Sequence, residues 1–143
     1  MNAIDFLIQE HNKVRSLFKD LNDPSHREET QKKLFLTIRD ELIRHEEMEQ
    51  QIWYPQLKSN KQWNEEIRHL ISEEHSAKKF IDKLNKMNDT ENWREGLKQL
   101  QEDVEHHAHE EETKLFPQVK RIMDDEELTR IGKEMKKFKD TYH

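Results

Sequence analysis

The sequence lacks several residue types, and these absences restrict both its fold and its chemistry. Its 143 residues include no cysteine, which excludes disulfides, thiolate metal sites and cysteine nucleophiles. Glycine occurs only twice and proline three times, so little in the chain interrupts a helix. Apolar residues make up only 31% of the chain, and the polar majority is rich in Glu, Lys, Gln and Arg, which favour helices. The composition therefore predicts helices around a thin apolar seam.

Long apolar runs are also missing. No stretch approaches the roughly 18 apolar residues that a membrane span requires, and the first residues do not resemble a secretion signal. We therefore expect a cytoplasmic protein without a membrane partner. The formal net charge of −6 disfavours a nucleic-acid partner, because binding to phosphates needs a concentrated basic face.

Residues typical of turns and helix caps divide the chain into five helical segments. They are predicted over residues 2–22, 26–58, 62–87, 91–121 and 125–140. Short connections between consecutive helices favour an all-α fold, an up-down-up-down four-helix bundle over residues 1–121. The additional C-terminal helix, 125–140, either lies along this bundle or contacts a second chain. We expect the whole chain, 1–143, to form a single domain.

An internal repeat relates the two halves of the chain. Residues 45–58 align without gaps on residues 107–120, and each copy contains a proline, Pro55 or Pro117, where a helix is expected to kink or end. The dipeptide Glu10-His11 recurs as Glu74-His75 on the preceding helix of each half. The repeat predicts two related helical hairpins.

Polar residues interrupt the apolar stripe of each bundle helix at helical spacing. In an antiparallel hairpin, two residues at the same height have a sequence midpoint near the connecting turn. The midpoints between the histidines of consecutive helices are 28, 60 and 91, close to the expected turns. The histidines are therefore predicted to lie at one level of the bundle. The residues assigned to this layer are His11, His45, Glu49, His75, His107 and Glu111. The remaining histidines, of which His106 and His109 should point off the seam, are not expected to bind metal; they are His26, His69, His106, His109 and His143.

Four buried imidazoles and two buried carboxylates are costly without compensation, and metal ions supply it. Two ions would each take two of the histidines, with Glu49 and Glu111 bridging them, and would keep positions open for a small ligand. These nitrogen and oxygen donors suit iron, and also zinc, manganese or cobalt. Glu46 is a candidate further ligand, and Glu10 and Glu74 are candidates for orienting histidines or for a solvated face. Four large apolar residues nearby are expected in the core or as walls of the site: Trp53, Tyr54, Leu115 and Phe116.

These motifs resemble the hemerythrin-like family, also called the HHE cation-binding domain, over residues 1–121. The resemblance implies a four-helix bundle with a non-heme di-iron centre, in which the four histidines are terminal ligands and the two glutamates bridge. The invertebrate oxygen carriers of this fold have a fifth histidine, in a His-x3-His pair on the third helix. Here Ile71 and Lys79 occupy the positions four residues from His75. This difference favours the bacterial-type relatives over reversible oxygen carriage.

Several functions remain open at this stage. The leading hypothesis is a di-iron protein that binds oxygen, nitric oxide or peroxide for sensing, storage or detoxification. The alternatives are a redox enzyme that consumes peroxide or nitric oxide, an iron donor in iron-sulfur repair, and a metal-free helical interaction module whose buried histidines respond to pH. The sequence identifies neither the physiological ligand nor a protein partner.

Overall fold

The computed structural model describes residues 1–142 and contains helices without strands in that range. The expected all-α fold is confirmed, and the helix ends lie within a few residues of those predicted. The helices are α1 (Ala3–Leu21), α2 (Glu28–Met48), α3 (Tyr54–Leu57), α4 (Asn64–Asn85), α5 (Thr90–Glu110), α6 (Phe116–Ile122) and α7 (Asp125–Thr141). Two π-helical turns, η1 (Glu49–Trp53) and η3 (Glu111–Leu115), join α2 to α3 and α5 to α6, and a 3₁₀ turn, η2 (Lys61–Trp63), precedes α4.

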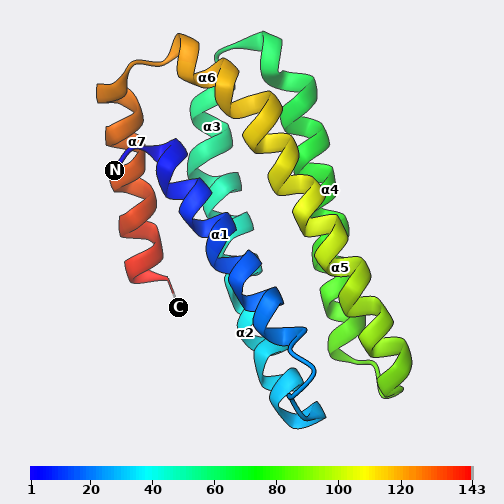
Figure 1. Cartoon of the computed structure of the whole chain (residues 1–143). Helices are drawn as coiled ribbons and strands as arrows, with labels where there is room; N and C mark the ends of the chain where they lie inside the picture. Colours follow the sequence, from blue (N-terminus) through cyan, green and yellow to red (C-terminus); the bar gives the residue numbers. More distant parts are fainter. Residues whose placement is uncertain (143) are drawn as a thin grey trace.

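The helices form two antiparallel hairpins (Figure 1). One hairpin pairs α1 with the continuous rod of α2, η1 and α3, and the other pairs α4 with the rod of α5, η3 and α6. The hairpins lie side by side in the same orientation, as the internal repeat predicts.

Short polar side chains cap three of the helices, and two of these caps, Asp89 and Asp124, lie where turn and cap residues divide the sequence. Asn2 accepts a hydrogen bond from the Asp5 N–H at 2.9 Å, and Asp124 accepts one from the Glu127 N–H at 2.8 Å. Asp89 caps α5 by accepting from the Glu91 N–H at 3.1 Å. These bonds satisfy backbone N–H groups that a helix start leaves unpaired.

The core consists of two apolar clusters along the bundle, with a polar layer between them. On α1, Leu7 belongs to one cluster and Val14 to the other, and the buried Glu10 and His11 lie between them. The other long rods follow the same order, so the polar layer crosses the middle of the bundle. Trp53, Tyr54, Leu115 and Phe116 are all buried in the first cluster.

Helix α7 lies against α1, near the N-terminus (Figure 1). Its buried Leu128, Ile131 and Met135 complete the first apolar cluster. At Gly132 a Cβ atom would lie 2.6 Å from the carbonyl oxygen of Met1, so glycine permits the close approach of the two segments. Within residues 1–142, no helix is both long and apolar enough to cross a membrane.

Candidate metal centre

The two glutamates of the predicted layer each begin a π-helical turn. The Tyr54 N–H donates to the carbonyl of Glu49, and the Phe116 N–H donates to the carbonyl of Glu111, five residues back in each case. A proline follows each of these two donors, Pro55 after Tyr54 and Pro117 after Phe116. In a regular α-helix its ring would clash with the carbonyl four residues earlier. The wider turn removes this clash, so each helix continues past its proline instead of ending there. Such turns are frequent at functional sites.

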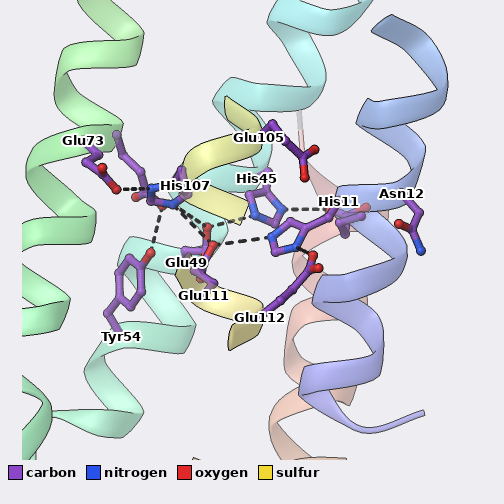
Figure 2. Close-up of polar contacts among 12 residues, drawn as sticks. His11, Asn12, His45, Glu49, Tyr54, Glu73, Glu105, His107, Glu111 and Glu112 are labelled. Atoms are coloured by element: carbon purple, nitrogen blue, oxygen red, sulfur yellow. Dashed lines mark hydrogen bonds and ion pairs between the residues drawn. The ribbon is translucent and has the colours of Figure 1, made fainter. Parts of the chain in front are cut away.

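Three histidines converge on the two glutamates inside the bundle (Figure 2). The His45 Nε2 lies 2.8 Å from the Glu49 Oε1. The Nε2 atoms of His11 and His107 lie 3.4 Å and 3.3 Å from the same oxygen, the Glu111 Oε1. Both glutamates have a relative exposure of 0%. Helices α1, α2 and α5 and the two π turns therefore bring five of the six predicted residues together.

The outer nitrogen of each of these histidines faces another carboxylate. The His11 Nδ1 lies 2.6 Å from the Glu112 Oε2, and the His107 Nδ1 lies 3.1 Å from the Glu73 Oε1. The His45 Nδ1 lies 3.5 Å from the Glu10 Oε1, so Glu10 has the orienting position considered for it from the sequence. The hydrogen bonds at Nδ1 of His11 and His107 fix these rings and direct their Nε2 atoms inward, which is the usual arrangement around metal-binding histidines. The Nδ1 of His45, by contrast, forms no hydrogen bond within residues 1–142.

Many inward-facing polar atoms of this cluster form no hydrogen bond with any residue in the described range. They are the Nε2 atoms of His11 and His45 and all four carboxylate oxygens of Glu49 and Glu111. Buried polar atoms are rarely left unpaired, because each costs about 1–3 kcal/mol. The donor types and their convergence fit metal ions.

The donor atoms fall into two overlapping groups. One consists of His11, His45 and Glu111, and the other of Glu49, His107 and Glu111, and in each group the atoms lie within 4.8 Å of one another. Glu111 belongs to both groups, as a carboxylate between two ions would.

The structure does not bring His75 into this cluster. Its side chain is exposed, whereas the preceding residue, Glu74, is 2% exposed and faces the site. The Glu74 Oε2 lies 3.0 Å from the His107 Nε2 and accepts a hydrogen bond of 2.9 Å from the Tyr54 hydroxyl. Helical spacing from Ile67 also allows a stripe through Ile71 to His75, and on that stripe His75 would face the layer. The buried stripe of α4 instead runs through Ile67, Leu70, Glu74, Ile81 and Leu84.

Three further histidines, His26, His106 and His109, lie outside the buried cluster. His26 is partly exposed and pairs with Asp20, and His109 is exposed. His106 points away from the buried layer, as the helical period predicted, and His143 lies outside the described residues.

The carboxylates of the layer divide into charged and protonated groups. Burial opposes the charge on Glu111, but the close Glu49, His107 and His11 side chains outweigh this effect and lower the pKa of Glu111. Burial and the nearby charge of Glu111 raise the pKa of Glu49. Burial also raises the pKa of Glu46 to about 8 and that of Glu74 to about 7, and a neighbouring glutamate adds to each shift. Without added positive charge the layer therefore retains protons on several carboxyl groups.

A cavity of about 390 Å³ adjoins the cluster between the two hairpins. His11, His45, Glu46 and Glu74 are among its lining residues, together with apolar side chains of the second cluster such as Phe18. The other side of the site is closed by packed aromatic rings. Phe116 stacks on His11 with ring centroids 6.0 Å apart. A small molecule could therefore reach the cluster from the cavity side.

Comparison with known proteins agrees with this geometry. The family model described as the Hemerythrin HHE cation binding domain matches residues 2–119. The chain belongs to this family. The hemerythrin domain is also 27% identical over 144 residues to a protein of Nostoc sp. (strain PCC 7120 / SAG 25.82 / UTEX 2576) named DNA nickase. That alignment covers 97% of this chain and 39% of the relative, so the hemerythrin domain spans well under half of the relative's length. No solved structure matches it.

Sequence reasoning missed two acidic residues of the hemerythrin domain that orient its histidines. Glu73 and Glu112 face the Nδ1 atoms of His107 and His11. Glu112 directly follows the predicted ligand Glu111, and Glu73 is one residue from the recognised Glu74. A search for acidic residues on the helix next to each predicted histidine would have suggested both.

Proposed function

We propose that this hemerythrin domain binds two iron ions in the polar layer and receives oxygen, nitric oxide or peroxide there, for sensing, storage or detoxification. The observation that supports this proposal most strongly is the pair of donor groups that share Glu111 beside a cavity. In this proposal His11, His45, Glu49, His107 and Glu111 hold the ions, and Glu74 takes the place that the sequence assigned to His75.

Each group in the site has a distinct part in this function. Iron would supply redox chemistry and coordination positions for a small ligand. The outer carboxylates hold the imidazole rings in position. The Glu46 carboxyl, with a pKa of about 8, lies on the cavity and holds a proton close to an incoming ligand. The apolar clusters on either side limit access of water.

Anaerobic addition of ferrous iron tests the proposal directly. We expect two iron ions per chain by metal analysis, and visible absorption of an oxidised di-iron centre after exposure to oxygen. One iron or fewer per chain, with no such bands, would refute it. Catalytic consumption of peroxide or nitric oxide faster than free iron achieves would instead favour the redox enzyme.

Substitutions test whether Glu74 or His75 supplies the remaining metal ligand. We expect Glu74→Gln to weaken iron binding about tenfold or more, because it removes a carboxylate in contact with His107. His75→Gln should bind iron like the unmodified protein, since that side chain is exposed. His109→Gln, an exposed substitution on α5, is the control for both in a competition titration with a chelator. Loss of iron in His75→Gln alone would restore the ligand set predicted from sequence.

The name of the Nostoc relative concerns a protein in which this domain is a minor part. Our proposal includes no DNA substrate, because a formal net charge of −6 is unfavourable for contact with phosphates.

A further inference from the structure

A second cluster of histidines and glutamates lies on the α4–α5 hairpin, and His69, Glu73 and His106 of this cluster also line the cavity beside the buried centre. Each helix contributes a His-x3-Glu pair, His69 with Glu73 on α4 and His106 with Glu110 on α5. Residues four apart share one face of a helix. The midpoint of 69 and 110, like that of 73 and 106, falls between residues 89 and 90, at the connection between the helices. The antiparallel pairing therefore places each histidine opposite the glutamate of the other helix.

Three of the four nitrogen–oxygen distances in this cluster are close to those expected around a small metal ion. Donor atoms bound to one tetrahedral zinc ion lie about 3.3 Å apart, given metal–ligand distances of about 2.0–2.1 Å. The His69 Nε2 lies 3.4 Å from the Glu73 Oε2 and 3.3 Å from the Glu110 Oε2. The His106 Nε2 lies 3.6 Å from the Glu73 Oε2 and 2.7 Å from the Glu110 Oε1. One nitrogen of each histidine thus faces both carboxylates.

Glu110 gives an independent indication of a ligand. It is only 6% exposed. Its Oε2 atom is buried and accepts no hydrogen bond from residues 1–142. The two histidines, by contrast, have side chains that are 54% and 62% exposed, so the cluster is open to solvent. An ion could therefore reach a buried carboxylate oxygen that accepts no hydrogen bond from residues 1–142.

Glu73 connects this cluster to the buried centre. Its Oε1 lies 3.1 Å from the Nδ1 of His107, while its Oε2 faces His69 and His106. One carboxylate therefore orients a histidine of the buried centre and offers its second oxygen to the surface cluster.

We propose that His69, Glu73, His106 and Glu110 form a surface site for one divalent transition-metal ion of the zinc class, separate from the buried di-iron layer. Two imidazoles and two carboxylates are a donor set that zinc and cobalt accept in tetrahedral geometry. Because Glu73 is shared, an ion at this site is electrostatically coupled to His107 of the buried centre.

Cobalt(II) titration of the full chain, loaded with iron beforehand, tests this site. The unmodified protein should bind one more cobalt ion than the double variant His69→Gln/His106→Gln, with the visible bands of a tetrahedral cobalt site. His109→Gln is the matched control, because it removes an exposed histidine three residues from His106 and should keep the additional ion. The substituted histidines are exposed, so the variants should fold, which circular dichroism checks.

The comparison counts only the surface ion, because any cobalt in the buried layer contributes equally to all three proteins. Equal cobalt stoichiometry in the unmodified protein and the double variant would overturn the proposal, as would an equal loss in His109→Gln. Iron content should be the same in all three proteins. A failure of iron binding in every protein would bear on the buried centre and would leave the difference in cobalt binding readable.

Discussion

Removal of the bound metal should lower the unfolding temperature of this protein by about 10 °C or more. Six buried donor atoms, on His11, His45, Glu49 and Glu111, form no hydrogen bond within residues 1–142. Metal binding compensates for their burial, and this binding free energy adds to folding stability because the unfolded chain does not assemble the site. At a free metal concentration about a thousand times the dissociation constant, the gain is about 4 kcal/mol. With only 31% apolar residues, the chain has little further hydrophobic burial to offset the loss of the metal.

Thermal unfolding followed by circular dichroism, with iron-loaded and chelator-treated protein at one pH, measures this effect. The variant His69→Gln/His106→Gln is a useful control, since it should retain the full difference if the buried layer is responsible. Equal unfolding temperatures with and without metal would contradict the prediction. That result would favour the metal-free interaction module considered from the sequence.

The positions of the helices and of the polar layer were predictable because they depend on local chemistry and simple spacing. Asp89 and Asp124 cap α5 and α7, and short polar residues of this kind mark helix starts in the sequence. His11 and His107 occupy the layer because they continue apolar stripes at steps of three and four residues. The repeat supplied an independent check, since two copies of one motif must have equivalent positions in related hairpins.

Helical spacing could not decide which residue of the Glu74-His75 dipeptide faces the buried layer. Steps of three and four residues are equally compatible with a helical stripe, so Ile67 leads either through Ile71 to His75 or through Leu70 to Glu74. The midpoint rule has a tolerance of more than one residue and cannot separate neighbours. Packing decides, because Leu70 is fully buried.

The π turns were also absent from the prediction, although their cause is visible in the sequence. Pro55 and Pro117 indicated a disturbance of each helix, and a kink or an end was the expected form. A regular helix and a widened turn differ by one residue in hydrogen-bond register, which apolar periodicity does not resolve. The repeat of the turn after 62 residues, from Glu49 to Glu111, shows that the same local sequence selects it twice.

The substitution Glu49→Gln should have opposite effects on the metal-free and metal-loaded protein. Glu49 is fully buried, and burial together with the charge of Glu111 raises its pKa. A carboxyl whose pKa is raised by folding destabilises the folded state as the pH rises above the usual value of 4.5. Glutamine keeps the shape and removes this charge, so the metal-free variant should be more stable than the metal-free parent by about 1–3 kcal/mol near pH 8.

The sign of the pH dependence separates this explanation from a general effect of substitution. Between pH 5 and 8 the metal-free parent should lose stability, because Glu46, with a pKa of about 8, and Glu74, with a pKa of about 7, also favour the protonated state in the folded protein. Glu49→Gln should show a shallower slope in urea unfolding across this range. The exposed substitution Glu102→Gln should keep the slope of the parent.

Iron binding should respond to Glu49→Gln in the reverse sense. Metal ligands must be deprotonated, so rising pH strengthens metal binding while it weakens the metal-free fold. A neutral amide cannot replace the carboxylate between Nε2 of His45 and the second donor group, so the variant should hold fewer than two iron ions per chain. A variant that binds iron like the parent would remove Glu49 from the ligand set, and one that is less stable without metal would show that its carboxylate supports the fold by itself. The predicted combination, a more stable metal-free fold with an impaired metal site, is expected only if the buried charge is retained for metal binding.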